Sequence, residues 1–333
     1  MQHQNGELFV EPLANGLRRL RVSPRDPNFY VQRSEIVTAY PEWLIEQILE
    51  NKGLAYICDE IARDEDPNYL ELVKQLLCYF DESQLNGKHI LDFGCGSGAS
   101  TMQLYRRFPR SSIIGVELDS GALHIARSRA SFYRFPKENL KQSPRGTELP
   151  SDLGMFDLVI MNAVYEHLVP NERDVILAKL WGLVKPGGHL FLCETPYRWN
   201  LVETHTTQLP LINYLPDKLT HWMACCFSKR VERNVSWETL LRLGIRGGSD
   251  SEILKRLQNG RNDIEFIEPS RNGVKDRVDL WLVGSRRPER LKRLVKAAVR
   301  AVRALTGKTF VPNLCLAFRK YSATEGTATG TRH

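Results

Sequence analysis

The sequence lacks long apolar runs and paired cysteine motifs. No stretch approaches 18 uninterrupted apolar residues, the length that a membrane-spanning helix needs, which argues against a membrane span. The seven cysteines are scattered without a CxxC spacing, so a disulfide or zinc framework is a poor explanation of the fold. The first seven residues have neither the basic nor the apolar part of a secretion signal. We therefore expect a cytoplasmic protein with reduced thiols.

Positive charge is concentrated in one segment. The formal net charge is +7, and residues 286–308 hold nine basic side chains and one acidic one, so this segment alone accounts for the excess. Its apolar residues recur at helical spacing with cations opposite, which predicts a basic amphipathic helix. Two interpretations stay open. The apolar side packs on a sheet and the charges are solvated, or the helix contacts an anionic membrane surface. No stacking aromatics interleave the cations, so we expect no nucleic-acid partner.

Residues 90–99, Ile-Leu-Asp-Phe-Gly-Cys-Gly-Ser-Gly-Ala, are the most informative stretch. An apolar strand ends at Asp92 and continues into three glycines within five residues, after which a helix begins. Such a loop leaves room for a ligand against the main chain, and the helix N-terminus suits a polar or anionic group. A second apolar run, 112–116, ends in Glu117, where an acid is placed to accept hydrogen bonds from ribose hydroxyls.

These segments resemble the class I S-adenosylmethionine-dependent methyltransferases. That family's loop is Asp-x-Gly-x-Gly-x-Gly, as in residues 92–98, and Lys-Pro-Gly-Gly precedes its fifth strand, as in residues 185–188. The resemblance covers about residues 85–200. A dinucleotide-dependent oxidoreductase is the alternative for the same loop, but its Gly-x-Gly-x-x-Gly pattern places the third glycine one residue later.

The resemblance implies a set of cofactor contacts. The loop residues would line the methionine part of S-adenosylmethionine, an acid would bind the ribose, and Asn162 would face the methionyl amine or carboxylate. The expected cofactor-binding residues are Asp92, Gly94, Cys95, Gly96, Gly98, Glu117, Leu118 and Asn162. The adenine contact is less defined, because residues 143–150 lack the family's aspartate; Glu148 or a backbone group is the candidate.

Three residues are candidates for catalysis: Glu166, His167 and His205. A histidine with an ordinary pKa near 6.5 suits removal of a proton from a hydroxyl acceptor at neutral pH. The alternative is that the Glu166–His167 pair anchors the following helix and that His205 lies in a surface loop. The pair resembles the ubiquinone-pathway O-methyltransferases, where it is associated with a divalent metal. Ala163 stands where a further acid would be expected, so we predict no metal.

The predicted architecture is α/β: a Rossmann-like, seven-stranded, mostly parallel sheet with helices on both faces. An N-terminal arm of loops with a short strand and a helical cap would occupy residues 1–84. The methyltransferase domain would span 85–321 and include an acceptor lid at 194–262, and residues 322–333 would form a disordered tail. Tyr197, Arg198 and Trp199 would join His205 in an acceptor pocket.

The expected function is O-methylation of a hydroxyl on a sugar, a glycan-lipid or a natural product. The alternatives are an N- or C-methyltransferase of a small metabolite, and a regulatory protein that binds S-adenosylmethionine without transferring its methyl group. The sequence leaves the oligomeric state open.

Overall fold

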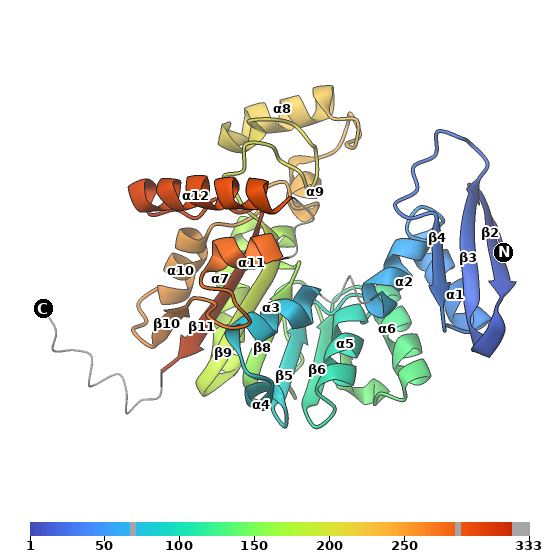
Figure 1. Ribbon diagram of the computed structural model, residues 1–333, viewed down its shortest axis with the longest axis horizontal. Helices are drawn as coiled ribbons and strands as arrows, with labels where there is room; N and C mark the ends of the chain where they lie inside the picture. The colour runs from blue at the N-terminus through green and yellow to red at the C-terminus, as the bar shows by residue number, and fades with distance from the viewer. Residues whose placement is uncertain (67–70, 284–287, 322–333) are drawn as a thin grey trace, which may run out of the picture.

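The computed structural model describes residues 1–66, 71–283 and 288–321, and a seven-stranded sheet forms its centre (Figure 1). The strands are β5 (His89–Phe93), β6 (Ser112–Glu117), β7 (Leu140–Gln142), β8 (Phe156–Asn162), β9 (Val184–Pro196), β10 (Ile264–Ile267) and β11 (Asn313–Lys320). Their order is β10-β11-β9-β8-β5-β6-β7, and β11 runs antiparallel to the other six strands. The predicted fold class is confirmed.

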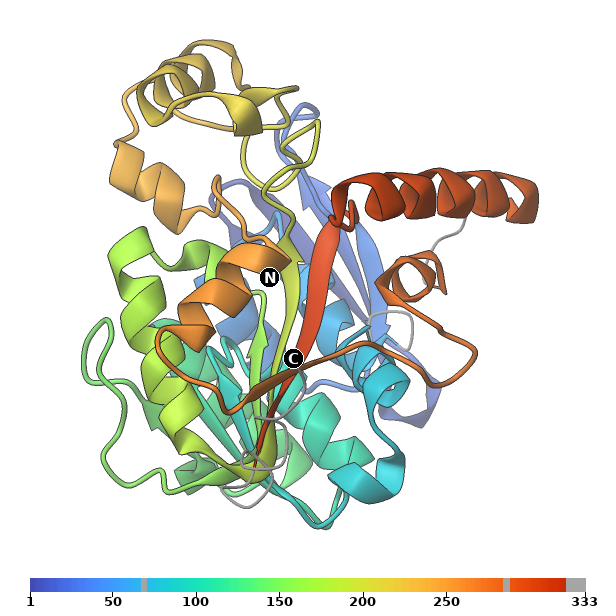
Figure 2. The ribbon, with the colours of Figure 1, turned by 90° about the vertical axis from the view of Figure 1, so that its left-hand side faces the viewer.

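Strand residues alternate between two apolar cores, one on each face of the sheet. In β8, Leu158 and Ile160 belong to one core, and Val159 and Met161 belong to the other. Because both faces are covered, the strand is apolar almost throughout. The helices that complete these cores are α3 (Glu71–Tyr79), α4 (Glu82–Leu85), α5 (Ala99–Arg107), α6 (Ser120–Tyr133), α7 (Pro170–Leu183), α10 (Asp250–Gln258) and α11 (Arg277–Val283). Figure 2 shows helices on both sides of the sheet.

The N-terminal region is a four-stranded antiparallel sheet, so the prediction of an arm of loops is wrong. Its strands are β1 (Gln2–His3), β2 (Gly6–Pro12), β3 (Arg18–Pro24) and β4 (Glu35–Thr38). Leu8, Leu20 and Ile36 are buried against the two cap helices that follow. Those helices are α1 (Glu42–Lys52) and α2 (Ile57–Glu65). Asn15 and Gly16, both with positive φ, turn the chain between β2 and β3; this Asn-Gly pair is the signal that sequence reasoning missed.

The lid segment (residues 194–262) contains more regular structure than its weak periodicity suggests. Two helices, α8 (Asp217–Phe227) and α9 (Trp237–Arg242), stand beyond the carboxyl ends of the parallel strands (Figures 1 and 2). Helix α10 instead packs into the sheet's second core through Ile253 and Leu257. The lid segment is therefore tied to the sheet at its end.

The predicted basic helix is present as α12 (Glu289–Thr306), between β10 and β11 in the chain. Its cations Lys296, Arg300 and Arg303 pair with acids on the body of the protein. Leu294 and Leu305 are 70% and 86% exposed, so the interpretation in which the apolar side packs on the sheet is wrong. Arg286, Arg287 and the predicted tail at 322–333 lie outside the described residues.

None of the helices in the described parts of the chain combines the length and the apolar character that a bilayer span requires.

Candidate functional site

The glycine-rich loop follows β5 and leads into α5, as the sequence predicts. The N–H groups of Gly94 and Cys95 donate to the carbonyl of Val116, at 2.8 and 3.1 Å. The N–H of Gly96 donates to Glu117 at 2.8 Å. These bonds fix the loop against the end of β6 and leave its remaining backbone beside the N-terminus of α5.

Two of the loop glycines cannot be replaced without displacing a neighbour. Gly94 has φ of +73°, and a Cβ added there would lie 2.4 Å from a methyl group of Val164. Gly98 has φ of +84°, and its added Cβ would lie 2.9 Å from the backbone of Ala126. The loop therefore requires glycine for both its conformation and its close packing. At Gly96, by contrast, nothing lies within 4 Å of an added Cβ, so the bare main chain there leaves space for a cofactor.

The side chain of Asp92 bonds to the first turn of α5, directly after the loop. This side chain is fully buried, and one carboxylate oxygen accepts bonds from the hydroxyls of Ser100 and Thr101, at 2.7 and 2.6 Å. The other oxygen, Oδ1, is buried without a partner. Burial raises the pKa of this carboxyl, and the two hydroxyls partly oppose the shift. A polar ligand group within reach of the loop would satisfy the orphaned oxygen; direct contact of Asp92 with a cofactor stays a prediction.

The other predicted cofactor residues gather at the same edge of the sheet. One oxygen of Glu117 accepts from the N–H groups of Leu118 and Asp119, at 2.7 and 2.8 Å, so its carboxylate is held at the tip of β6. Leu118 is exposed beside it. Asn162 lies at the end of β8, where its Oδ1 accepts from the thiol of Cys193 at 3.2 Å. The position of these residues fits the predicted contacts.

Cys95 lies inside the loop as a packing residue. It is buried, and burial raises the pKa of its thiol well above the ordinary value. A thiol in that environment stays protonated at neutral pH and is a poor nucleophile.

The cap holds the loop through a buried ion pair that the sequence did not reveal. Arg129 of α6 is fully buried, and its Nη1 donates to Glu60 of α2 at 2.9 Å and to the Ser97 carbonyl at 2.8 Å. The Ser97 hydroxyl also bonds Glu60. Burial alone would raise the pKa of Glu60, but Arg129 and Ser97 outweigh it and hold that pKa below its usual range. A cap helix therefore contacts the cofactor loop directly.

Strained backbone marks the neighbouring strand ends. Ala163 follows β8 and has φ of +54°. Glu194 lies near the end of β9 and has φ of +56°. The N–H of Ala163 donates to the carbonyl of Cys193 at 3.0 Å. The Glu194 carboxylate accepts from Gln75 and from Asn313. Positive φ in residues other than glycine is common at functional sites.

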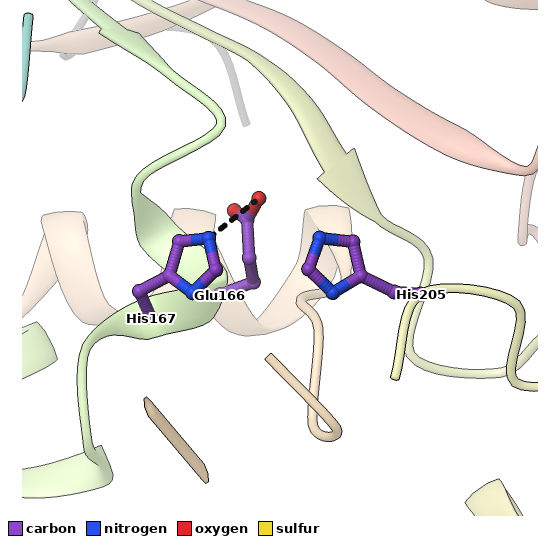
Figure 3. A group of neighbouring side chains, drawn as sticks. All are labelled: Glu166, His167 and His205. Atoms are coloured by element: carbon purple, nitrogen blue, oxygen red, sulfur yellow. Dashed lines mark ion pairs between the residues drawn. The ribbon is translucent and has the colours of Figure 1, made fainter. Parts of the chain in front are cut away.

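The structure brings the three predicted catalytic residues together. Glu166 and His167 lie in the short helix η4 (Tyr165–His167) after β8, and His205 comes from the lid segment. Figure 3 shows the Glu166 carboxyl group between the two imidazole rings, whose centres are 5.5 Å apart. His167 Nε2 lies 3.8 Å from Glu166 Oε1. Glu166 Oε1 is buried and has no hydrogen-bond partner, while Oε2 accepts from Thr195 at 3.2 Å.

Backbone carbonyls at the end of α9 orient both rings. His167 Nδ1 lies 2.7 Å from the Arg242 carbonyl, and His205 Nδ1 lies 3.0 Å from the Leu243 carbonyl. A carbonyl oxygen only accepts, so each Nδ1 carries the hydrogen and each Nε2 keeps its lone pair. The neutral rings can therefore accept a proton at Nε2.

Burial shifts the acidity of this cluster. It raises the pKa of Glu166 to about 7, assisted by Glu194, against the bond from Thr195. Burial also lowers the pKa of His167, assisted by His205, against its bond to the Arg242 carbonyl. At neutral pH His167 is a neutral imidazole beside a carboxyl group that is close to its titration midpoint.

The same three residues form a donor set for a metal. Their ligand atoms lie within 4.8 Å of one another, and two imidazole nitrogens with one carboxylate oxygen suit a divalent transition metal. The absence of a metal stays a prediction.

The predicted aromatic acceptor pocket is arranged differently from expectation. Arg198 donates to the Asn213 carbonyl and lies over the Trp199 ring, while Tyr197 is buried with an unpartnered hydroxyl. His205 instead lies beside His167, with the ring centres 5.5 Å apart. The folding of the lid, which no local sequence pattern encodes, decides this pairing.

Sequence comparisons match the part of the chain that contains the glycine-rich loop. The family model described as "Methyltransferase domain" matches residues 91–190. Carboxy-S-adenosyl-L-methionine synthase of a Shewanella species is 22% identical over 160 residues, covering 48% of this chain and 66% of that protein. Trans-aconitate 2-methyltransferase of Deinococcus radiodurans is 36% identical over 101 residues, covering 30% and 35%. The chain thus spans two thirds or less of the length of these two relatives.

Solved structures show only distant similarity. The plantazolicin methyltransferase BpumL, in complex with SAH, aligns with a TM-score of 0.45 and 13% identity, over 84% of this chain and 94% of that one. PKMT2 from Rickettsia typhi aligns with a TM-score of 0.45 and 16% identity, over 76% and 52%. Scores this low carry no argument about ligands.

One relative is more than 30% identical to this chain and is matched over most of its own length. An uncharacterized methyltransferase of Mycobacterium bovis is 31% identical over 191 residues, which cover 54% of this chain and 87% of that protein. With this match, the glycine-rich loop between β5 and α5 and the acid at the tip of β6, the chain belongs to the class I S-adenosylmethionine-dependent methyltransferases.

Proposed function

We propose that this protein transfers a methyl group from S-adenosylmethionine to a hydroxyl oxygen of a sugar, a glycan-lipid or a natural product. Bound S-adenosylmethionine supplies an electrophilic methyl group on a sulfonium sulfur. The observation that supports oxygen as the acceptor atom is the pair of imidazoles, His167 and His205, with free Nε2 lone pairs at the carboxyl edge of the sheet. A hydroxyl needs a base for such a step, whereas a neutral amine does not need one before attack.

The cofactor residues have distinct proposed roles. Glu117 accepts the ribose hydroxyls, since its carboxylate already points to the N–H of Gly96 at the loop. The backbone of residues 94–98 leaves space for the methionine part, and Asn162 bonds its amine or carboxylate. These contacts hold the methyl group in place for an in-line approach of the acceptor oxygen, which orientation makes effective.

The proton has a defined path. As the acceptor oxygen bonds to the methyl carbon and the carbon–sulfur bond breaks, the hydroxyl proton passes to Nε2 of His167 or His205. Glu166 then stabilises the imidazolium, because its carboxyl pKa of about 7 permits ionisation beside the new positive charge. The Arg242 and Leu243 carbonyls keep both rings in the tautomer that this transfer needs.

The acceptor is proposed to reach the site from a membrane surface. A glycan-lipid presents its hydroxyl at the headgroup level, and Arg290 and Arg293 of α12 are exposed cations that could contact such a surface. A soluble natural product would need no such contact.

The test uses purified protein, isotopically labelled methyl donor and a panel of hydroxyl acceptors with fractionated cell extract. We expect label in an O-methyl product and a fall of kcat by about 10²–10⁴-fold in His167→Ala or His205→Ala, with cofactor affinity unchanged. Retained turnover in both variants would favour an N- or C-methyltransferase. Cofactor binding without transfer to any acceptor would favour a regulatory role.

Chelation separates the imidazole base from a metal centre at the same residues. We expect turnover to survive exhaustive treatment with a chelator, because an imidazole lone pair accepts the proton. Loss of turnover that Zn²⁺ or Mg²⁺ restores would instead assign Glu166, His167 and His205 to a metal.

A further inference from the structure

Helix α12 rests on the protein through its charged side. Three of its cations form ion pairs with acids outside the helix: Lys296 with Asp279, Arg300 with Asp276 and Arg303 with Glu268. The nitrogen–oxygen distances are 2.6 Å for Arg300 and 2.8 Å for Arg303. The side of the helix that carries these three cations therefore faces the body of the protein.

The apolar side of α12 faces away from the body. An α-helix turns by about 100° per residue, so its leucines and Val302 lie opposite the paired cations. Leu305 is 86% exposed and Leu294 is 70% exposed, and Leu291 and Val302 are also exposed. A surface helix normally buries its apolar stripe, so this helix is inverted relative to the usual arrangement.

The exposed stripe is long enough to form a surface of its own. Eighteen residues of α-helix extend for about 27 Å. Contiguous exposed apolar patches on soluble proteins are usually sites of contact with a partner or a membrane. We therefore expect a partner or a membrane to cover the exposed apolar stripe on α12.

Helix α8 of the lid segment presents a similar face. Leu219, Trp222 and Phe227 are 42%, 54% and 58% exposed, and the Trp222 and Phe227 rings contact each other with centres 5.5 Å apart. The nearby cations Lys218 and Lys229 are exposed as well. Tryptophan, phenylalanine and leucine beside lysine and arginine are typical of helices that lie in a membrane interface.

The two helices lie at the same end of the molecule. Both views place α8 and α12 beyond the carboxyl ends of the parallel strands (Figures 1 and 2). The end of α12 adjoins the base of the lid segment, because Lys308 Nζ lies 5.8 Å from the centre of the Trp199 ring. A flat partner at this end could contact both helices.

Charge identifies the partner. Arg290 and Arg293 on α12 are exposed, and the chain carries a net charge of +7. A second copy of the chain would bring the same cations against these arginines, and like charges repel. An anionic lipid surface offers apolar volume for the leucines and negative headgroups for the cations.

We propose that α12 and α8 dock this protein on an anionic lipid bilayer, with Leu294, Leu305 and Trp222 inserted at the level of the headgroups. The inference deepens the membrane contact of the proposed function: the paired cationic side of α12 faces the protein, and the apolar side enters the lipid. Docking needs neither cofactor nor acceptor, so it can fail or succeed independently of methyl transfer.

The test is sedimentation of the full chain with vesicles of phosphatidylcholine, with or without 30% phosphatidylglycerol by design. We expect binding to the anionic vesicles that is weaker by roughly tenfold or more in Leu294→Glu/Leu305→Glu, because each leucine loses its burial in lipid. Phe9→Glu is the matched control, since Phe9 is 47% exposed on β2 of the N-terminal sheet, away from α12 (Figure 1). That variant should bind like the wild type.

Three results would overturn the proposal. The first is absence of binding to the anionic vesicles at about 0.1 M salt, where screening is already substantial. The second is a dimer in light scattering that Leu294→Glu/Leu305→Glu dissociates without any vesicle binding, which would make the stripe an interface between two copies. Unchanged circular dichroism and melting temperature would show that the variants are folded, and equal binding by wild type and the double variant would also contradict insertion.

Discussion

At the scale of residues, Glu166 has an environment that sets its protonation apart from that of an ordinary glutamate. It is fully buried between two imidazoles, and one of its oxygens has no partner. Neither property follows from the Glu-His dipeptide in the sequence. They arise because His205 and the end of α9 cover the carboxyl group.

The stability of the protein should depend on pH through Glu166. Its pKa is raised from 4.5 to about 7 in the folded state, so between these values the folded protein keeps a proton that the unfolded chain releases. Stability contributed by that proton is present below about pH 4.5 and is lost as pH rises to 7. Glu166→Gln removes the buried charge. The free energy of unfolding of this variant in urea, relative to that of the wild type, should therefore increase from pH 5 to pH 8 by on the order of 2–3 kcal/mol.

The control for this measurement is Glu138→Gln, which removes a carboxyl group that is exposed to solvent. If the difference between Glu166→Gln and wild type did not change with pH, the buried carboxyl group could not assist the imidazoles as proposed.

Cofactor affinity tests Glu117. Replacement by alanine removes an acceptor from the ribose site and also frees the N–H of Gly96. We expect calorimetry with S-adenosylhomocysteine to show a loss of roughly 1.5–3 kcal/mol. Glu117→Gln keeps one acceptor oxygen and should fall between alanine and wild type. Equal affinity in all three proteins would mean that this carboxylate does not bind the cofactor.

At the scale of elements, the lid segment completes the site. Gly244, just after α9, has φ of +89°, and a Cβ added there would lie 2.8 Å from His205 Nδ1 and 3.2 Å from Glu166 Cγ. The backbone of the lid therefore lies directly against the catalytic candidates.

Gly244→Ala should lower methyl transfer by roughly 10–100-fold, because displacing a positioned group by about 1 Å can cost that much. The matched control is Gly260→Ala, where φ is +78° and no atom lies within 4 Å of the added Cβ. Both variants bear about 1–2 kcal/mol of backbone strain, and Gly244→Ala adds the close contacts with His205 and Glu166, so the melting temperature of each variant is measured beside its transfer rate. Equal transfer rates in the two variants would show that closure of the lid over Glu166 is not required.

The sequence predicted elements well where periodicity and motifs agree. The glycine-rich motif at residues 92–98 correctly indicated the turn from β5 (His89–Phe93) into α5 (Ala99–Arg107). The N-terminal sheet was missed because its strands alternate only two or three apolar residues with arginines and prolines. The Asn15–Gly16 turn was the available signal. The meeting of His205 with His167 depends on the tertiary path of the lid, for which the sequence contains no periodic pattern.

At the scale of the whole molecule, the cap and the methyltransferase sheet behave as one body. The apolar core of the N-terminal region includes Ile125 from α6, and the Glu60–Arg129 pair joins the same two parts. The orientation of α12 is also a property of the whole molecule. Amphipathic spacing predicted the helix, but the acids that hold its cations lie elsewhere in the chain, so the sequence could not indicate which side faces outward.

Arg129→Met should destabilise the whole protein by about 3–5 kcal/mol in urea unfolding, because Glu60 would remain buried without its partner. Adding Glu60→Gln to this variant should restore part of the loss, since the unpaired buried carboxylate of Glu60 is then removed. Tryptophans in both parts, such as Trp43 in α1 and Trp181 in α7, should report one shared transition in the wild type. Separate transitions there would mean that the cap and the sheet unfold independently.

Under the proposed function, the division of the imidazole pair between η4 and the lid segment would link proton release to product departure. If the lid segment moved away to release product, water would reach the Glu166 carboxyl group, its affinity for hydrogen ions would fall, and a proton held in the cluster after turnover would be free to leave with the methylated product. Each catalytic cycle would then reset its own base by opening.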